Sequence, residues 1–158
     1  MSTRSLQFAI LALMAAMTAS AQLGQVSQQA GEAAQGDSKV RVYVYRNPGI
    51  TGKEFRPSVY VDEQDIARLQ AGHNVILAMN PGPHTFRSTD KKDQFTLDLK
   101  PGERYFVRID VSPVALKGRG KLTVVLPDQG EPEYGQTKPA DRSMVRDRSL
   151  IAPEFVAK

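Results

Sequence analysis

The chain of 158 residues contains no cysteine and no tryptophan, only two histidines, and 7% aromatic residues. Without cysteine it cannot form a disulfide, a thiolate metal site, a cysteine nucleophile or a lipid-modified N-terminal cysteine. The 21 basic residues only slightly outnumber the 17 acidic ones, so the charge neither requires nor excludes an anionic partner. The length and the hydrophobic content of 41% fit one ordinary globular domain.

The N-terminus has the pattern of a secretory signal peptide. Arg4 precedes a mostly apolar run, Leu6 to Met17, and small residues follow at Ala19-Ser20-Ala21. The run covers 12 positions, whereas a membrane span needs about 20. We therefore predict a cleaved signal peptide over residues 1–21, with no transmembrane or lipid anchor in the mature chain, and a periplasmic or secreted bacterial protein.

The rest of the chain divides into three parts. Residues 22–38 are rich in Gln, Gly and small residues, which predicts a flexible linker, with a short helix around residues 28–34 as the lesser alternative. Residues 39–127 carry strand patterns, and those patterns stop after Pro127. Residues 128–158 are predicted to form a C-terminal extension, which either packs Met144 and Ile151 on the domain as a short helix or stays mobile until it meets a partner.

Alternating apolar residues predict the first strands. In residues 39–46 three valines face one side, while Arg and Tyr face the other. Residues 47–57 hold two Pro and two Gly and predict a loop, and residues 58–62 predict a second strand. Between Asp62 and Gly72, capping residues and the spacing of Ile66 and Leu69 predict a short helix, with a compact turn as the alternative.

A short internal repeat predicts two hairpins. Residues 77–87 align with residues 97–107, each being an alternating strand, a Pro-Gly pair and another alternating strand. Pro-Gly suits the centre of a type II turn, so Pro81-Gly82 and Pro101-Gly102 are each predicted to join antiparallel neighbours. The charged residues 90–93 predict a solvated turn between the two hairpins.

These patterns together predict a mainly β protein. The expected fold is a small antiparallel β-sandwich of roughly six or seven strands built from hairpins, with one short helix and a C-terminal extension. The predicted core consists of the inward-facing positions of these elements: Val40, Val42, Val44, Val59, Val61, Ile66, Leu69, Val75, Leu77, Met79, Phe86, Phe95, Leu97, Leu99, Tyr105, Val107, Ile109, Leu122, Val124 and Leu126.

The chain offers few residues for catalysis or metal binding. His73 and His84 have no second ligand at metal-binding spacing. Asp62, Glu63 and Asp65 lack the oxygen spacing of a calcium loop, and helix capping explains them. Serine-nucleophile and phosphate-loop motifs are also missing from the sequence. We therefore predict no catalytic residue, no metal, no cofactor and no enzymatic activity; a hydrolase would have to use His84 or Asp62.

One polar-aromatic face is a candidate for recognition. Arg41, Tyr43, Tyr45 and Arg46 combine ring surface with guanidinium groups, which suits glycans, peptides or single-stranded nucleic acid. Cover by the loop of residues 47–57 or by the C-terminal extension is the competing interpretation. Nucleic acid is not an expected partner, because the protein is predicted to be exported and its basic residues are spread along the chain.

Five short motifs carry a resemblance to a known family. They are VYVYR at Val42–Arg46, SVYVD at Ser58–Asp62, L-x-x-G at Leu69–Gly72, PGPHTF at Pro81–Phe86 and PGERYFVRI at Pro101–Ile109. The span Val40–Val111 resembles the bacterial domain-of-unknown-function family 2846, found on secreted proteins and lipoproteins and similar in build to the PEGA-type β-module. The resemblance implies a small β-sandwich and no catalytic assignment.

We therefore expect a non-catalytic binding or structural module of the bacterial cell envelope. It would contact an envelope protein through a sheet edge or through the Arg/Tyr face. The alternative is a periplasmic domain that binds a glycan or peptidoglycan through that face. Binding to an anionic wall polymer would weaken steeply with salt, whereas strand pairing would not.

Overall fold

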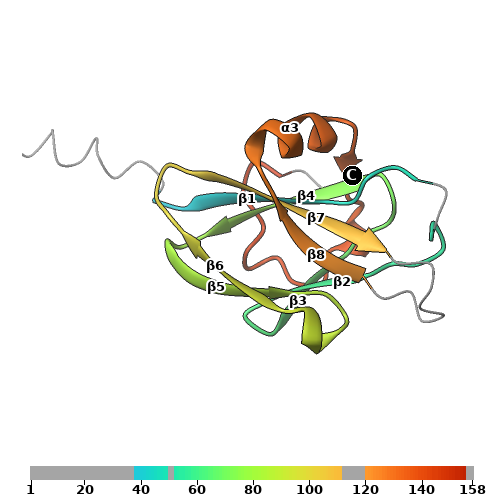
Figure 1. Cartoon of the computed structure of the whole chain (residues 1–158), viewed down its shortest axis with the longest axis horizontal. Helices are drawn as coiled ribbons and strands as arrows, with labels where there is room; N and C mark the ends of the chain where they lie inside the picture. The colour runs from blue at the N-terminus through green and yellow to red at the C-terminus, as the bar shows by residue number, and fades with distance from the viewer. Residues whose placement is uncertain (1–37, 50–51, 112–119, 156–158) are drawn as a thin grey trace, which may run out of the picture. The chain divides into compact units, whose positions relative to one another are not determined.

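The computed structural model describes residues 38–49, 52–111 and 120–155. The predicted signal peptide, residues 1–21, lies outside these ranges, as do residues 22–37 of the predicted linker. The described chain forms a five-stranded and a four-stranded sheet that face each other (Figure 1). The predicted mainly β sandwich is thus confirmed. No helix in the described ranges is long and apolar enough to cross a bilayer.

The five-stranded sheet has the order β8-β7-β1-β4-β9. Its strands are β1 (Val40–Tyr45), β4 (His73–Met79), β7 (Arg104–Val111), β8 (Gly120–Val125) and β9 (Lys138–Pro139). β1 pairs with β4 antiparallel and with β7 parallel. β4 and β9 are also parallel, so this sheet is mixed instead of purely antiparallel. β1 lies at its centre because its valines are buried on the inner face and its tyrosines are covered on the other.

The four-stranded sheet is antiparallel and has the order β3-β2-β5-β6. Its strands are β2 (Ser58–Val61), β3 (Gln64–Arg68), β5 (Gly82–Arg87) and β6 (Phe95–Leu99). The hairpin of β5 and β6 turns through the short 3₁₀ helix η1 (Lys91–Asp93), whose residues are exposed, as predicted for this turn. β5 and β6 also stack the rings of Phe86 and Phe95, with a centroid distance of 5.7 Å.

The main core lies between the two sheets, and most predicted core residues are buried there. Phe95, Leu97 and Tyr105 are only partly buried. Val124 and Leu126 are exposed, at 44% and 77%, so their assignment to the core is wrong. The reason is that β8 is the edge strand of its sheet and Leu126 lies beyond its end.

The helix predicted between Asp62 and Gly72 is wrong, because this segment contains strand β3. Asp62 and Glu63 have φ values of 47° and 67° and form the turn of the β2–β3 hairpin. Two successive left-handed residues match the twist of a tight hairpin, and Asp tolerates that conformation better than most residues. Ile66 and Leu69 are buried as expected, but as residues of an extended segment.

The two Pro-Gly pairs do not form the predicted hairpins. Pro81-Gly82 connects β4 to β5, and Pro101-Gly102 connects β6 to β7, and in both cases the joined strands belong to different sheets. Gly82 has a φ of 122° and Gly102 a φ of 78°, both in the region that favours glycine. The repeat therefore marks two equivalent corners at which the chain crosses the sandwich.

Helix α3 (Pro127–Gly135) forms a third layer on the outer face of the five-stranded sheet (Figure 1). Under it lies a second apolar cluster of Tyr45, Phe106 and Val125, with Tyr43 and Tyr134 at its border. Gly130 of α3 packs directly on Phe106, where a Cβ atom would come within 2.5 Å of the ring base.

The C-terminal segment (residues 138–155) pairs with edges of both sheets. It begins as β9 beside the start of β4, bridges to β3 at Ala67 and Val145, and returns to β4, where Leu150 accepts a hydrogen bond from the amide of Ala78. Its 3₁₀ turn η2 (Arg142–Met144) buries Met144. Met144 and Ile151 thus pack on the sandwich, but through strand pairing and a 3₁₀ turn instead of one short helix.

Candidate functional site

The four residues predicted to bind a partner do not form one exposed face. Tyr45 is fully buried, and Arg46 is 4% exposed. Tyr43 is partly buried and stacks on Phe106 at a centroid distance of 5.0 Å. Arg41 forms an ion pair with Glu154. The competing interpretation, cover by the C-terminal part of the chain, therefore holds for the tyrosines, and a binding role of this face stays a prediction.

Arg46 holds the loop that follows β1. Its guanidinium donates to the carbonyl of Gly52 at 2.6 Å and to that of Phe55 at 2.7 Å. Burial lowers the pKa of Arg46, partly offset by the charge of Glu54. A buried guanidinium whose donors are taken by backbone carbonyls stabilises a loop and is not available to a ligand.

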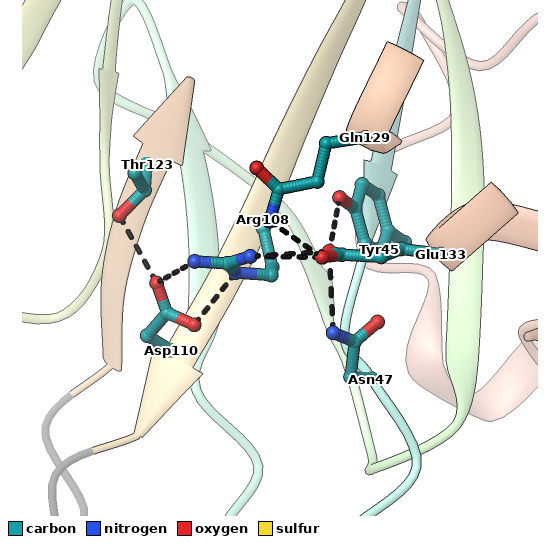
Figure 2. A network of polar contacts seen from close by, with 7 residues as sticks. All are labelled: Tyr45, Asn47, Arg108, Asp110, Thr123, Gln129 and Glu133. Carbon is teal, nitrogen blue, oxygen red and sulfur yellow. Dashed lines mark hydrogen bonds and ion pairs between the residues drawn. The ribbon is translucent and has the colours of Figure 1, made fainter. Parts of the chain in front are cut away.

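A polar network lies between α3 and the sheet (Figure 2). Its centre is the Glu133 carboxylate, which accepts hydrogen bonds from Tyr45 Oη at 2.8 Å and from Arg108 Nη1 at 3.1 Å. Asn47 and Gln129 donate to the same carboxylate at 3.2 and 2.8 Å. Figure 2 shows these donors converging on Glu133 from β1, from β7, from the loop after β1 and from α3 itself.

The network continues from Glu133 to the edge strand. Arg108 also donates from Nε to Asp110 at 2.9 Å, and Thr123 of β8 donates from its hydroxyl to the other oxygen of Asp110 at 3.1 Å. A continuous series of hydrogen bonds thus links α3 to β8 through two charged side chains of β7 (Figure 2).

Electrostatics make this network unsuited to proton transfer near neutral pH. Burial alone would raise the pKa of Glu133, but the hydrogen bonds from Gln129, Tyr45, Arg108 and Asn47 lower it to about 2. Burial and the bond to Glu133 raise the pKa of Tyr45 far above its usual range. A general acid or base works best with a pKa close to the operating pH, so both groups are better explained as fixed hydrogen-bonding partners.

The structure brings His84 and Asp62 together, although they are 22 residues apart in sequence. His84 Nδ1 lies 2.6 Å from Asp62 Oδ2, and Nε2 lies 3.0 Å from the carbonyl of Asn80. The second Asp62 oxygen accepts from the amide of Thr85 at 2.9 Å. Both ring nitrogens thus contact groups of the protein itself, so the pair fastens the β2–β3 turn to β5 and leaves no ring nitrogen for a substrate.

The other candidate metal ligands are likewise paired within the fold. Glu63 binds Arg87 at 2.8 Å, and Asp65 binds Arg68 at 3.3 Å. His73 Nδ1 lies 3.0 Å from the carbonyl of Ala71. Within the ranges that the structure describes, no three His, Cys, Asp or Glu side chains gather into a possible metal site.

The free edge of the five-stranded sheet carries an unusual exposed surface. Val124 and Leu126 are the large hydrophobic residues that are exposed in the described chain, and both belong to β8 or the residue just after it. Within the described ranges β8 pairs with β7 alone, and its first residue, Gly120, is buried next to Pro57 and Ser88. Sequence patterning could not reveal this surface, because Val124 and Leu126 continue the alternation of the buried Leu122.

The remaining edges are covered or carry charge. The C-terminal segment pairs with β4 and β3. β6, the free edge of the other sheet, exposes Thr96 and Asp98. Charged side chains on an edge strand discourage pairing with other chains. β8 also exposes one charged residue, Lys121, near its start. Among the edges described by the structure, β8 is set apart by the exposure of Val124 and Leu126 toward its other end.

Comparison with known proteins gives a family and no further identity. A comparison with curated proteins found no match. A family model described as a protein of unknown function, DUF2846, matches residues 36–120, which is more than half of the chain. The match spans the three central strands of the five-stranded sheet, β7, β1 and β4, and the whole of the four-stranded sheet. The chain therefore belongs to the DUF2846 family.

Proposed function

We propose that this protein is a non-catalytic binding module of the bacterial cell envelope, exported by its signal peptide, and that it contacts another protein through the edge strand β8. The observation that supports this proposal is the exposure of Val124 and Leu126 on an edge strand that has a neighbour on one side only. A partner strand adding to β8 would satisfy its outer backbone groups and cover both side chains.

The chain itself shows that this sandwich accepts extended segments at its edges. Residues 138–140 and 150–152 lie along β4, and their amides and carbonyls join its outer side. β8 lies at the opposite end of the same sheet. The proposed contact therefore repeats, with a partner's strand, the pairing that the C-terminal segment makes within the molecule.

The glycan or peptidoglycan alternative has less support. It required the Arg/Tyr face, and Tyr45 and Arg46 lie inside the molecule. Tyr43 and Tyr134 pack edge to face at 5.1 Å, which engages part of the ring surface that a sugar would need.

The test is photo-crosslinking in intact cells. A photo-reactive amino acid at position 124 should capture a specific protein, whereas the same group at position 96 on β6 should not. Val124→Lys should abolish partner capture measured from position 126, because an edge lysine disfavours pairing, and Val124→Thr should retain it. Equal capture from positions 124 and 96, or capture unaffected by Val124→Lys, would contradict the proposal.

A further inference from the structure

The way in which β8 is held bears directly on its use as a binding edge. β8 is followed at once by α3, with Leu126 at the N-cap and Pro127 in the first turn. The exposed Leu126 is thus the joint between the edge strand and the helix. Any movement of α3 must change the end of β8 and the position of that side chain.

Helix α3 has little stability of its own. It has nine residues, contains Pro132 and two glycines, and has no side-chain hydrogen bond at its N-cap. Isolated helices shorter than about 12 residues are marginal in water even with favourable sequences, and Gly and Pro disfavour the helix further. Its position therefore depends on contacts with the sheet, and Glu133 supplies most of the polar ones.

Side chains of β7 connect Glu133 to β8 by hydrogen bonds. Arg108 lies directly opposite Thr123 in the register of the two strands. The Arg108 guanidinium contacts Glu133 on one side and Asp110 on the other, and Asp110 binds the Thr123 hydroxyl. A change at Glu133 thus frees Arg108 to reorient, and Asp110 can then follow it away from Thr123.

We propose that Glu133 is a positioning residue for the binding edge: through Arg108 and Asp110 it fixes Thr123 and holds β8 extended and ready to accept a partner strand. This inference rests on the proposed function for its consequence in binding. A preordered edge loses less conformational freedom when it pairs, which favours association. The simpler alternative is that Glu133 only fastens α3 and leaves β8 unaffected.

The first test is amide hydrogen exchange of the purified protein. Glu133→Gln should accelerate exchange of the β8 amides that bond to β7 by roughly tenfold, the effect expected when a hydrogen bond to a charged group is lost. The matched control is Glu131→Gln, because Glu131 is on the same helix and pairs with Arg104 of β7, but both side chains are more than half exposed. This control should leave β8 exchange unchanged within about twofold.

The second variant works from the opposite end of the series. Thr123→Val keeps the shape of the side chain and removes the hydroxyl. It should accelerate exchange in α3, although in the described structure the Thr123 hydroxyl bonds to Asp110 and not to α3. In the double variant Glu133→Gln/Thr123→Val, the factor by which amide exchange accelerates should be smaller than the product of the two single-variant factors. The reason is that both substitutions interrupt the same series of hydrogen bonds. The proposal would be overturned if Glu133→Gln accelerated exchange in α3 alone and if the two acceleration factors simply multiplied in the double variant.

The binding consequence is measured with the photo-reactive group at position 124. Capture should fall several-fold in Glu133→Gln and not in Glu131→Gln. If β8 exchange changes as expected while capture stays equal in the two variants, the edge is positioned but positioning does not govern binding, which overturns the inference and leaves the proposed function intact. If the unaltered protein captures nothing, the proposed function fails, while the exchange results still decide whether Glu133 positions β8.

Discussion

The low pKa of Glu133 predicts a specific loss of stability in acid. The carboxyl has a pKa of about 2 in the folded protein instead of its ordinary 4.5. The unfolded chain therefore binds more protons than the folded one between these values, and stability must fall as the pH drops from about 4.5 to about 2. At about 1.4 kcal/mol per pKa unit, the difference corresponds to about 3 kcal/mol.

Contact with solvent reduces that figure. The Glu133 side chain is 20% exposed, so we expect about 1–2 kcal/mol after screening. The measurement is the free energy of unfolding in urea at several pH values from 5 to 2.5, compared between the unaltered protein and Glu133→Gln. The variant should be less stable at pH 5, and the gap should narrow by about 1–2 kcal/mol at the acid end.

Other carboxylates also have lowered pKa values, so a control is needed. Asp62, Glu63 and Asp147 also have lowered pKa values, because hydrogen bonds outweigh the effect of burial. They are present in both proteins, so their contributions cancel in the comparison. Glu131→Gln, which removes an exposed carboxylate of the same helix, should keep the acid dependence of the unaltered protein. Parallel curves for the unaltered protein and Glu133→Gln would refute the reasoning.

Three further substitutions test the packing around the site. Gly130→Ala should lower stability by about 1–3 kcal/mol in thermal unfolding, because its Cβ would lie 2.5 Å from Phe106. Gly135→Ala is the control on the same helix, because its Cβ would meet no atom within 4 Å, and it should leave stability unchanged. Arg46→Met should cost about 2–4 kcal/mol and increase proteolysis of the adjacent loop, since the buried carbonyl of Gly52 and the partly buried carbonyl of Phe55 lose their donor. Intact stability would contradict this role. Met144→Ala should cost about 2–4 kcal/mol and raise hydrogen exchange along the C-terminal segment, and unchanged exchange there would show that Met144 does not anchor it.

Much of the fold could be predicted because the apolar alternation reports burial directly. Val40, Val42 and Val44 face the core as the pattern requires, and the strands around Val59 and Val75 lie where alternation places them. Successive side chains of a strand point to opposite faces, so an apolar residue at every second position marks the buried face. Local patterning therefore identified where most strands run, β3 excepted, and most of the buried positions.

Pairing between strands could not be predicted from the same signals. A Pro-Gly pair permits a tight reversal, but whether the next strand pairs with the last one or crosses to the other sheet depends on the rest of the fold. The Asp62-Glu63 turn was missed because it lacks the Asn-Gly or Asp-Gly signal of a two-residue hairpin. The spacing of Ile66 and Leu69 then imitated a helix face.

The candidate site could likewise be predicted only in part. Tyr43 and Tyr45 were correctly placed on the face opposite the valines, yet the sequence of α3 gives little sign that a helix covers them, since it contains two glycines and an internal proline. The convergence of Tyr45, Arg108 and Glu133 joins residues up to 88 positions apart. Only the assembled fold brings such groups together.

The chain beyond the matched family region contributes strand β8, helix α3 and the C-terminal segment to the described domain, so the matched region alone is not its folding unit. A protein ending at residue 120 would lose β8 and α3, so Phe106 and Tyr45 would face water. It would also leave β3 and β4 unpaired along their outer sides. Unpaired strand edges next to solvent-exposed aromatic rings strongly favour self-association. Recombinant protein should therefore include the chain through residue 155, because a protein that ends at residue 120 is expected to aggregate.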